Sequence, residues 1–138
     1  MAKKKKIPRA GFIPYYQADS DSDLQIMVMV PSDPSYGGDK PQIAKGKIDP
    51  GENAKEAALR EASEEVGLVQ SNVVSTHYLG TFLGYTEIFY GEIKDPDNFT
   101  GTTYETDESY WVSVDDFLKE GRDIHKPIVR AFLRAIGE

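Results

Sequence analysis

Glutamate residues gather in one stretch of the chain, residues 46–68, which reads GKIDPGENAKEAALREASEEVGL. The five glutamates stand at positions 52, 56, 61, 64 and 65. Clustered carboxylates, together with backbone oxygens that glycines leave accessible, are the ligands that a hard cation such as Mg²⁺ prefers. The stretch is therefore a candidate cation site, and one element of secondary structure has to bring its carboxylates together.

A helix over residues 54–66 would carry most of these glutamates. Asn53 is a good N-cap, and Glu56 stands three residues later, as a capping box requires. Alanine and leucine in the following turns favour a helix, and Gly67 supplies a stop at its C-terminus. The sequence thus predicts both ends of this helix.

The acidic side chains of the predicted helix lie beside its apolar side. With Glu61 set at zero and about 100° per residue, Glu65 falls at about 40° and Glu64 at about −60°. The apolar side, between about 60° and 160°, consists of Ala58, Leu59, Ala62 and Val66. Like charges four residues apart repel, and the last turn of a helix disfavours negative charge. A bound cation would explain this arrangement, and the alternative is a solvated acidic face.

The full pattern from Gly46 to Leu68 resembles the Nudix box. Gly46 is followed after five residues by Glu52, and seven more residues lead to REASEEVGL at residues 60–68. Every fixed position of the box is matched, with Ala62 at an aliphatic position. The order of the strands expected outside the box is also similar to that of a Nudix domain.

The resemblance implies an α/β protein with the Nudix fold, a mixed β-sheet sandwiched between α-helices. It implies hydrolysis of a nucleoside diphosphate linked to another group, with Mg²⁺ or Mn²⁺ as cofactor. Glu61, Glu64 and Glu65 match the family's metal-binding and base-supplying glutamates, and Gly46 matches a residue whose carbonyl often binds metal. Two further matches, Arg60 and Glu52, correspond to a pair that orients the helix and the preceding loop.

The chemistry of a phosphoanhydride explains why the family needs a cation. The bridge is anionic and repels nucleophiles, whereas metal ions neutralise its oxygens, hold a water molecule and lower that water's pKa. A carboxylate then accepts the proton. An acidic protein can therefore hold an acidic substrate, because the metal stands between them.

Residues outside the box bear on the substrate. Lys45 precedes Gly46 as in dinucleoside polyphosphate hydrolases and mRNA-decapping relatives, and Tyr85 follows Leu68 by 17 residues, a spacing that resembles the dinucleoside polyphosphate subgroup. We therefore expect a substrate such as Ap4A, with Lys45 and Tyr85 as substrate-binding residues. The alternatives are ADP-ribose, a dNTP or an RNA 5′ end as substrate, or a non-catalytic nucleotide-binding module. The alternative roles are also open, since Lys45 could be a surface lysine and Tyr85 an ordinary aromatic residue of a strand.

The stretch before the box departs from the polyphosphate pattern. PQIA stands at residues 41–44, where a Trp-x-x-Pro sequence is common. The aromatic ring that stacks on a base must then come from elsewhere, and the candidates are Tyr15, Tyr36, Tyr85 and Tyr90.

Acidic residues before Trp111 could supply one more metal ligand or base. Glu105, Asp107 and Glu108 fall in an expected loop, and Glu108 is the best candidate for a metal ligand, with a solvated loop as the alternative. His77 and His125 have no ligand spacing between them, and we expect both to be structural.

The remaining pattern predicts strands around residues 11–16, 24–30, 42–44, 73–83, 86–93 and 110–114. Pro14 places the first strand at an edge or at a bulge. A short helix over residues 115–121, begun by Asp115 or Asp116, and a helix over residues 126–138 complete the pattern.

Length and charge indicate one domain with a basic arm. The 138 residues carry a net charge of −7, and the first ten residues alone carry +5. We expect an arm over residues 1–8 and a Nudix domain over residues 9–138. The arm, with its lysines at 3–6, is a solvated tail or a contact for nucleic acid. The chain has no cysteine, no apolar run of membrane-spanning length and no signal-peptide core, which indicates the cytoplasm. Its oligomeric state is left open.

Overall fold

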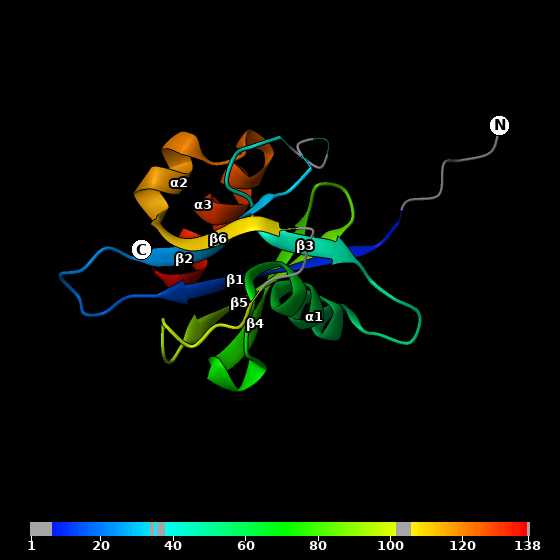
Figure 1. Ribbon diagram of the computed structural model, residues 1–138, viewed down its shortest axis with the longest axis horizontal. Helices are drawn as coiled ribbons and strands as arrows, with labels where there is room; N and C mark the ends of the chain where they lie inside the picture. The colour runs from blue at the N-terminus through cyan, green and yellow to red at the C-terminus, as the bar shows by residue number, and fades with distance from the viewer. Residues whose placement is uncertain (1–6, 34, 36–37, 102–105, 138) are drawn as a thin grey trace.

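The computed structural model of the chain describes residues 7–33, 35, 38–101 and 106–137. Within these residues, a six-stranded sheet lies between α1 on one side and α2 and α3 on the other (Figure 1). The expected sandwich of a mixed sheet between helices is therefore confirmed. The lysine arm, residues 3–6, lies outside the described residues.

The strands are not ordered in space as they are along the chain. The path across the sheet is β4 (Val73–Phe82), β5 (Thr86–Ile93), β1 (Arg9–Tyr16), β2 (Gln25–Pro31) and β6 (Thr106–Ser113), and β3 (Ala44–Lys47) also pairs with β1. The pair of β1 and β5 is parallel and the other pairs are antiparallel. Gln42 joins the sheet only as an isolated bridge to Met29, so the strand predicted over residues 42–44 begins two residues later than expected.

Strand β1 is central, which corrects the first of the two predictions for Pro14, an edge or a bulge. Its first half pairs with β3 as far as Phe12, its last two residues pair with β2 from Tyr15 onward, and β5 lies along its other side. Pro14 falls between the two partners on one side, where the ladder is interrupted. A proline lacks the N–H that a continuous ladder needs, and this change of partner accommodates it.

Alternating side chains along the central strands supply two hydrophobic layers, one on each face of the sheet. The layer under α1 includes Ala10, Phe12, Met27, Met29, Ala62 and Val66. The layer under α2 and α3 includes Ile13, Ile26, Val28, Phe117, Val129 and Phe132. Burial on both faces fixes the register of β1 and β2, because a shift of one residue would exchange the two layers.

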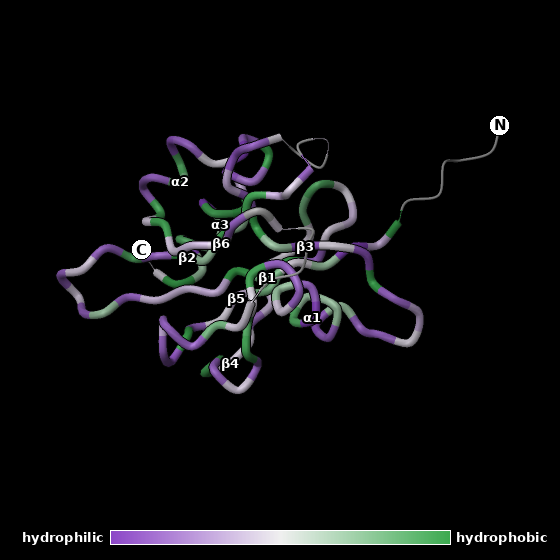
Figure 2. The backbone as a smooth tube through the Cα atoms, in the orientation of Figure 1, coloured by the Kyte–Doolittle hydropathy of each residue, from purple (hydrophilic) through white to green (hydrophobic). Residues whose placement is uncertain are grey.

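Helix α1 (Ala54–Val66) begins and ends as its sequence predicts. The Asn53 side chain accepts a hydrogen bond from the Glu56 N–H at 2.8 Å, and the Glu56 carboxylate accepts one from the Asn53 N–H at 3.1 Å. Gly67 adopts φ of 75°, the left-handed conformation that ends many helices. Hydrophobic and hydrophilic residues alternate along this helix (Figure 2), and its apolar side faces β1 and β3.

The last two helices cover the other face of the sheet. Helix α2 (Val114–Glu120) is capped by Ser113, whose hydroxyl accepts from the Asp116 N–H, and it therefore begins before the predicted Asp115 or Asp116. Helix α3 spans Lys126–Ile136, and short 3₁₀ helices, η2 and η3, span Gln70–Asn72 and Asp123–His125. None of the helices in the described part of the chain has the length and apolarity needed to cross a membrane.

Candidate active site

A cleft of about 840 Å³ runs along β3, and residues from β1, β2, α1 and the segment before η3 line it. Its lining carries both signs of charge. Glu61 and Glu65 come from α1, whereas Arg9, Lys45 and Arg122 come from β1, β3 and the segment before η3. This volume lies within the range of small-molecule binding sites. Two of the box glutamates and the predicted Lys45 therefore share one cleft.

Close packing of α1 on the sheet brings Glu61 and Glu65 into this cleft. Ala57, Ala58 and Ala62 are fully buried, and such small side chains let the helix approach the strands. The buried arc of the helix runs from Ala57, at about −40° on the wheel, to Val66, at about 140°. Glu65, at about 40°, falls inside this arc. The sequence predicted that the acidic side chains lie beside the buried side of the helix. In the structure the buried side is wider and includes the position of Glu65.

Burial has a large effect on the ionisation of the Glu61–Glu65 pair. Loss of hydration and the neighbouring Glu61 raise the pKa of Glu65 to about 9, although the Lys45 N–H and ammonium favour its charged form. Burial likewise raises the pKa of Glu61, against the opposing effect of Arg60. Two carboxylates that share a poorly hydrated site cannot both ionise without a compensating positive charge.

One oxygen of this pair lacks a partner. Glu65 Oε2 is completely buried and has no hydrogen-bond partner among the described residues. Gly46 packs directly on the neighbouring carboxylate, because a Cβ atom added at Gly46 would collide with the Glu61 carboxylate. The backbone of β3 therefore approaches the Glu61 carboxylate more closely than any other residue type at position 46 would permit.

Arg60 connects the loop before α1 to the acidic side of the helix. Its Nε and Nη2 atoms donate to both oxygens of Glu52, at 2.8 and 3.0 Å, and Nη2 also donates to the Lys47 carbonyl at 2.9 Å. Glu52 in turn accepts from the Asp49 N–H at 2.9 Å. These bonds hold the loop of residues 47–52 against the helix and raise the pKa of the guanidinium.

The same guanidinium contacts two more box glutamates. Arg60 Nη1 lies 3.0 Å from Glu61 Oε1 and 3.3 Å from Glu64 Oε2. Glu64 is more exposed than Glu61, with 43% against 13% of the side chain accessible, and it is not among the residues that line the cleft. Within the described residues, no three carboxylate or imidazole groups lie close enough to form a complete cation cage.

Contacts beyond the helix fasten its C-terminal end. The Thr106 hydroxyl at the start of β6 donates to the Glu65 carbonyl at 2.8 Å, and the Thr100 N–H donates to the Gly67 carbonyl at 2.7 Å. A Cβ atom at Gly67 would collide with the Thr100 carbonyl. The last turn, which carries Glu64 and Glu65, is therefore held by segments about 35 and 40 residues further along the chain.

Tyr85 lies at the edge of the site, in the turn between β4 and β5. Its carbonyl accepts from the Arg9 N–H at 3.0 Å, so it adjoins a cleft residue without being one of the lining residues. Its side chain is 47% exposed. Two other stacking candidates, Tyr15 and Tyr90, pack on Phe132 with ring centroids 5.2 and 5.6 Å away, in the layer under α3. Tyr36 lies outside the described residues.

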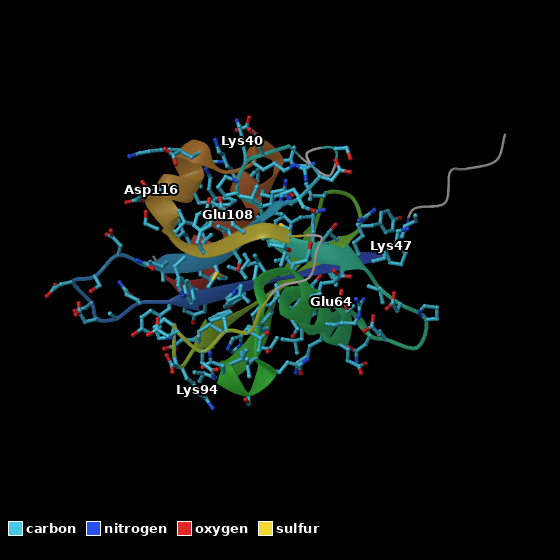
Figure 3. The ribbon with its side chains drawn as sticks, in the orientation of Figure 1. Lys40, Lys47, Glu64, Lys94, Glu108 and Asp116 are labelled. Atoms are coloured by element: carbon cyan, nitrogen blue, oxygen red, sulfur yellow. The ribbon has the colours of Figure 1, made fainter. Side chains whose placement is uncertain are left out.

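Glu108 is not brought together with the box glutamates. It pairs with Val30 in the middle of β6, and by alternation it shares a face with Tyr110 and Val112, which pack on the layer under α2 and α3. Figure 3 shows Glu108 beside α2 and Glu64 on the other side of the sheet. The prediction of a fourth acidic ligand in a loop did not allow for a strand that starts at Thr106. Glu105 and the side chain of Asp107 lie outside the described residues.

The two histidines have different surroundings. His77 is exposed on β4, where Nε2 lies 2.8 Å from the Ser75 hydroxyl. His125 is fully buried, and its Nδ1 accepts a hydrogen bond from the Ile43 N–H at 3.0 Å. Burial and the charges of Lys45 and Arg122 lower the pKa of His125 to about 3. A neutral His125 thus holds the segment that leads into β3.

Sequence reasoning did not single out Arg9, Gln42 or Arg122 as residues of the site. Arg9, the first residue of the predicted domain, opens β1 and lines the cleft. Gln42 and Arg122 also line it, and Arg122 Nη1 donates to Gln42 Oε1 at 3.4 Å. These residues belong to segments far apart in the chain, and no local pattern marks them as neighbours. The only signal in the sequence was that Gln42 lies close to the box.

Solved structures with the same fold are Nudix proteins. A C. elegans Ap4A hydrolase binary complex is 19% identical, with a TM-score of 0.72 over 95% of this chain and 98% of that chain. The NUDIX domain of Shewanella oneidensis NrtR complexed with ADP ribose is 12% identical, with a TM-score of 0.77 over 97% and 90%. RenU, a Nudix hydrolase from M. smegmatis, is 17% identical, with a TM-score of 0.74 over 96% and 88%. At these identities the likeness shows the fold alone.

Comparison with protein families gives a more specific result. No curated protein sequence matches the chain. The NUDIX domain family matches residues 16–132, a range that contains the whole of residues 46–68. Since that match covers most of the chain and every fixed position of the box is present, the protein belongs to the Nudix hydrolase family.

Proposed function

We propose that this Nudix hydrolase uses Mg²⁺, or Mn²⁺ in its place, to cleave a phosphoanhydride bond of a dinucleoside polyphosphate such as Ap4A. The observation that carries the proposal is the half-buried Glu61–Glu65 pair, which lines the same cleft as Lys45. The pair offers negative charge to a cation, and Lys45 offers positive charge to phosphate oxygens.

The residues present fit a divalent cation. Glu65 Oε2 is a buried oxygen without a partner, and Gly46 leaves the Glu61 carboxylate directly against the backbone. Carboxylate and carbonyl oxygens are the ligands that Mg²⁺ and Mn²⁺ prefer. Glu61, Glu65 and the Gly46 carbonyl would hold the ion, and Glu64 would join them by turning away from Arg60. Bound there, the ion would neutralise phosphate oxygens and lower the pKa of a coordinated water.

The chain's own residues then perform the remaining steps. Arg60 and Glu52 fix the loop and the helix relative to each other, so that the ligands keep their spacing. Lys45 binds an oxygen of the phosphate chain. One of the box carboxylates accepts the proton of the attacking water, a step that contributes roughly 10²–10⁴-fold in enzymes generally. Glu64, exposed at the end of the helix, or the buried Glu65 could hold that proton.

Support for a dinucleoside polyphosphate comes from outside the box. Lys45 lines the cleft, and Tyr85 adjoins it through the backbone of Arg9. The exposed ring of Tyr85 offers a face for a base, a contact worth about 1–3 kcal/mol in nucleic-acid complexes. The similarity in fold to a C. elegans Ap4A hydrolase is compatible with this choice. ADP-ribose, a dNTP and an RNA 5′ end are the alternatives.

A substrate panel tests the proposal. Purified protein with Mg²⁺ or Mn²⁺ is assayed against Ap4A, Ap3A, ADP-ribose, dNTPs, NADH and 5′-triphosphate RNA. We expect kcat/KM to be highest for Ap4A. A higher kcat/KM for ADP-ribose than for Ap4A would contradict the dinucleoside polyphosphate assignment and place the protein in another subgroup of the family. Absence of turnover with every compound, despite nucleotide binding, would identify a binding module instead.

Two tyrosine variants test the base contact. Tyr85→Ala is expected to lower kcat/KM for Ap4A about 10-fold or more, because the stacking surface is lost. Tyr78→Ala is the matched control, since Tyr78 is 53% exposed on the same hairpin, and it should leave kcat/KM unchanged. Equal values for both variants would remove Tyr85 from the site.

A cytoplasmic location also stays a prediction, for cell fractionation to test.

A further inference from the structure

The basic residues of the cleft lack acidic partners. Arg9, Lys45 and Arg122 all line it, and none of them forms an ion pair with another described residue. Four carboxylates also line the cleft, namely Asp33, Asp49, Glu61 and Glu65. Asp49 and Glu61 pair with Arg60, and Asp33 accepts from the Ser35 N–H. The cations from three different segments are therefore grouped without a counter-charge in contact.

Gln42 provides a second, independent observation in the same place. It is 4% exposed, lines the cleft, and leaves its Nε2 buried with no hydrogen-bond partner among the described residues. Arg122 has only donor groups, so the amide atom that faces it must be the oxygen. The amide nitrogen is thereby left as a donor without an acceptor. A buried donor of this kind calls for an acceptor oxygen, which a water molecule or an anionic ligand can supply.

The backbone around Gln42 is held from two sides. Gln42 and Met29 exchange hydrogen bonds of 2.8 and 3.0 Å, which tie the segment to β2. The Arg122 N–H donates to the Pro41 carbonyl at 3.0 Å, and the Ile43 N–H donates to His125 Nδ1 at 3.0 Å. The donor of Gln42 and the guanidinium of Arg122 therefore keep their relative positions before any ligand arrives.

We propose that Gln42 and Arg122 form a phosphate-binding subsite that receives a phosphate group beyond the two that form the cleaved bond. This inference rests on the proposed function, since it places the cleaved bond at Glu61 and Glu65. A substrate with two phosphates would occupy the glutamate end alone. A chain of three or more phosphates would also reach the subsite, which therefore selects for longer phosphate chains.

Inorganic tripolyphosphate is the probe, because it tests the subsite without turnover. Calorimetric titration in EDTA removes any contribution from a metal at the glutamates. We expect wild-type protein to bind tripolyphosphate, and Arg122→Gln and Gln42→Glu to bind it at least 10-fold more weakly. Arg130→Gln is the matched control, because Arg130 is exposed on α3 and is not among the residues that line the cleft, and the affinity of this variant should stay within 2-fold of wild type.

Folding of the variants is checked by thermal melting. Gln42→Glu keeps the size of the side chain and lets the new carboxylate pair with Arg122, so the fold should persist while the positive charge is cancelled. If the variant at position 42 or 122 does not fold, the variant at the other position tests the same subsite. Wild-type affinity in the folded variants, or no binding by the wild-type protein, would overturn the subsite.

Steady-state kinetics separates the subsite from the proposed function. Arg122→Gln should raise KM for Ap4A about 10-fold with kcat within 3-fold, and should change KM for ADP-ribose by less than 2-fold. Equal changes for both substrates would contradict selection by chain length. If no phosphoanhydride is cleaved at all, the proposed function fails, whereas the tripolyphosphate titration still decides the subsite.

Discussion

Glu65 is an acid in surroundings that disfavour its charge. Its position inside the buried arc of α1 removes water from the carboxylate, and Glu61 adds repulsion. Folding thus raises the pKa of Glu65 from its ordinary value to about 9. The folded protein without metal keeps a proton that the unfolded chain has released above about pH 4.5.

The first prediction concerns Glu65→Gln in EDTA. Because the folded state binds more protons between about pH 4.5 and pH 9, the wild-type unfolding free energy should fall as pH rises through that window. The unfolding free energy of Glu65→Gln should fall much less over this window, and at pH 9 it should be roughly 1–3 kcal/mol above that of the wild type. Urea unfolding at pH 6 and pH 9 measures it. Glu92→Gln, an exposed control, should behave as the wild type does.

His125 is the opposite case, because its folded pKa, about 3, lies below its ordinary value of 6.5. The unfolded chain binds the proton first on acidification, so stability that is present above pH 6.5 is lost as pH falls toward 3. His125→Asn keeps an acceptor near the place of Nδ1. The unfolding free energy that this variant loses on acidification should be smaller than that of the wild type by about 2–4 kcal/mol. Unfolding free energies at pH 7 and pH 4.5 measure it. An equally flat profile for His77→Asn would contradict the assignment.

At the scale of elements, β3 and α1 form the site because their backbones come unusually close. Gly46 of β3 packs on the carboxylate of Glu61, and the alanines of α1 leave no bulk between the helix and the sheet. The loop between these elements is held by Arg60, Glu52 and Asp49. The glycine and the alanines are therefore as much part of the site as the glutamates.

Gly46→Ala tests this close approach. The added Cβ would collide with the Glu61 carboxylate, so this carboxylate must move from its present position. We expect hydrolysis to fall about 10²-fold or more, with a loss of stability of only about 1–3 kcal/mol for overpacking. Gly101→Ala is the control, because nothing lies within 4 Å of a Cβ there. Activity within 3-fold of wild type in Gly46→Ala would show that the contact is not needed.

At the scale of the whole molecule, an acidic protein presents a cleft that holds both charges. The chain has a net charge of −7, which repels a phosphate chain at long range. Arg9, Lys45 and Arg122 converge from separate segments onto the same cleft as the glutamates. Under the proposed function, the substrate would neutralise the cations of the cleft and the metal its carboxylates, so binding of either should favour binding of the other.

The whole-molecule prediction concerns removal of the metal. Mg²⁺ at 100 times its Kd should stabilise the folded state by about 2.7 kcal/mol, seen as a higher Tm. Excess EDTA should abolish hydrolysis and leave the circular dichroism spectrum unchanged, since the alanines of α1 and its capping box still hold the helix. Turnover at the full rate in excess EDTA would contradict the metal mechanism.

The sequence by itself determined the local parts of this protein. Helix α1, its Asn53 cap and its Gly67 end depend on residues three to five positions apart, which interact in the same way in any context. The Nudix box is likewise a local spacing, and it identified the family that the comparison confirms. The continuous apolar run of residues 26–30 predicted β2, and the sequence also predicted β4 and β5, since residues favourable to a strand are a property of the local chain.

Only the tertiary structure decided what depends on packing between distant segments. The approach of α1 to β1 and β3 placed Glu65 inside the buried arc of the helix. A helical wheel could not predict this, because it does not show how the helix packs on the sheet. The pairing of β6 with β2 set the face on which Glu108 lies. Arg9, Gln42 and Arg122 line one cleft because the strands cross over, and a contact such as that between Gln42 and Arg122, 80 positions apart, leaves no periodic signal along the chain.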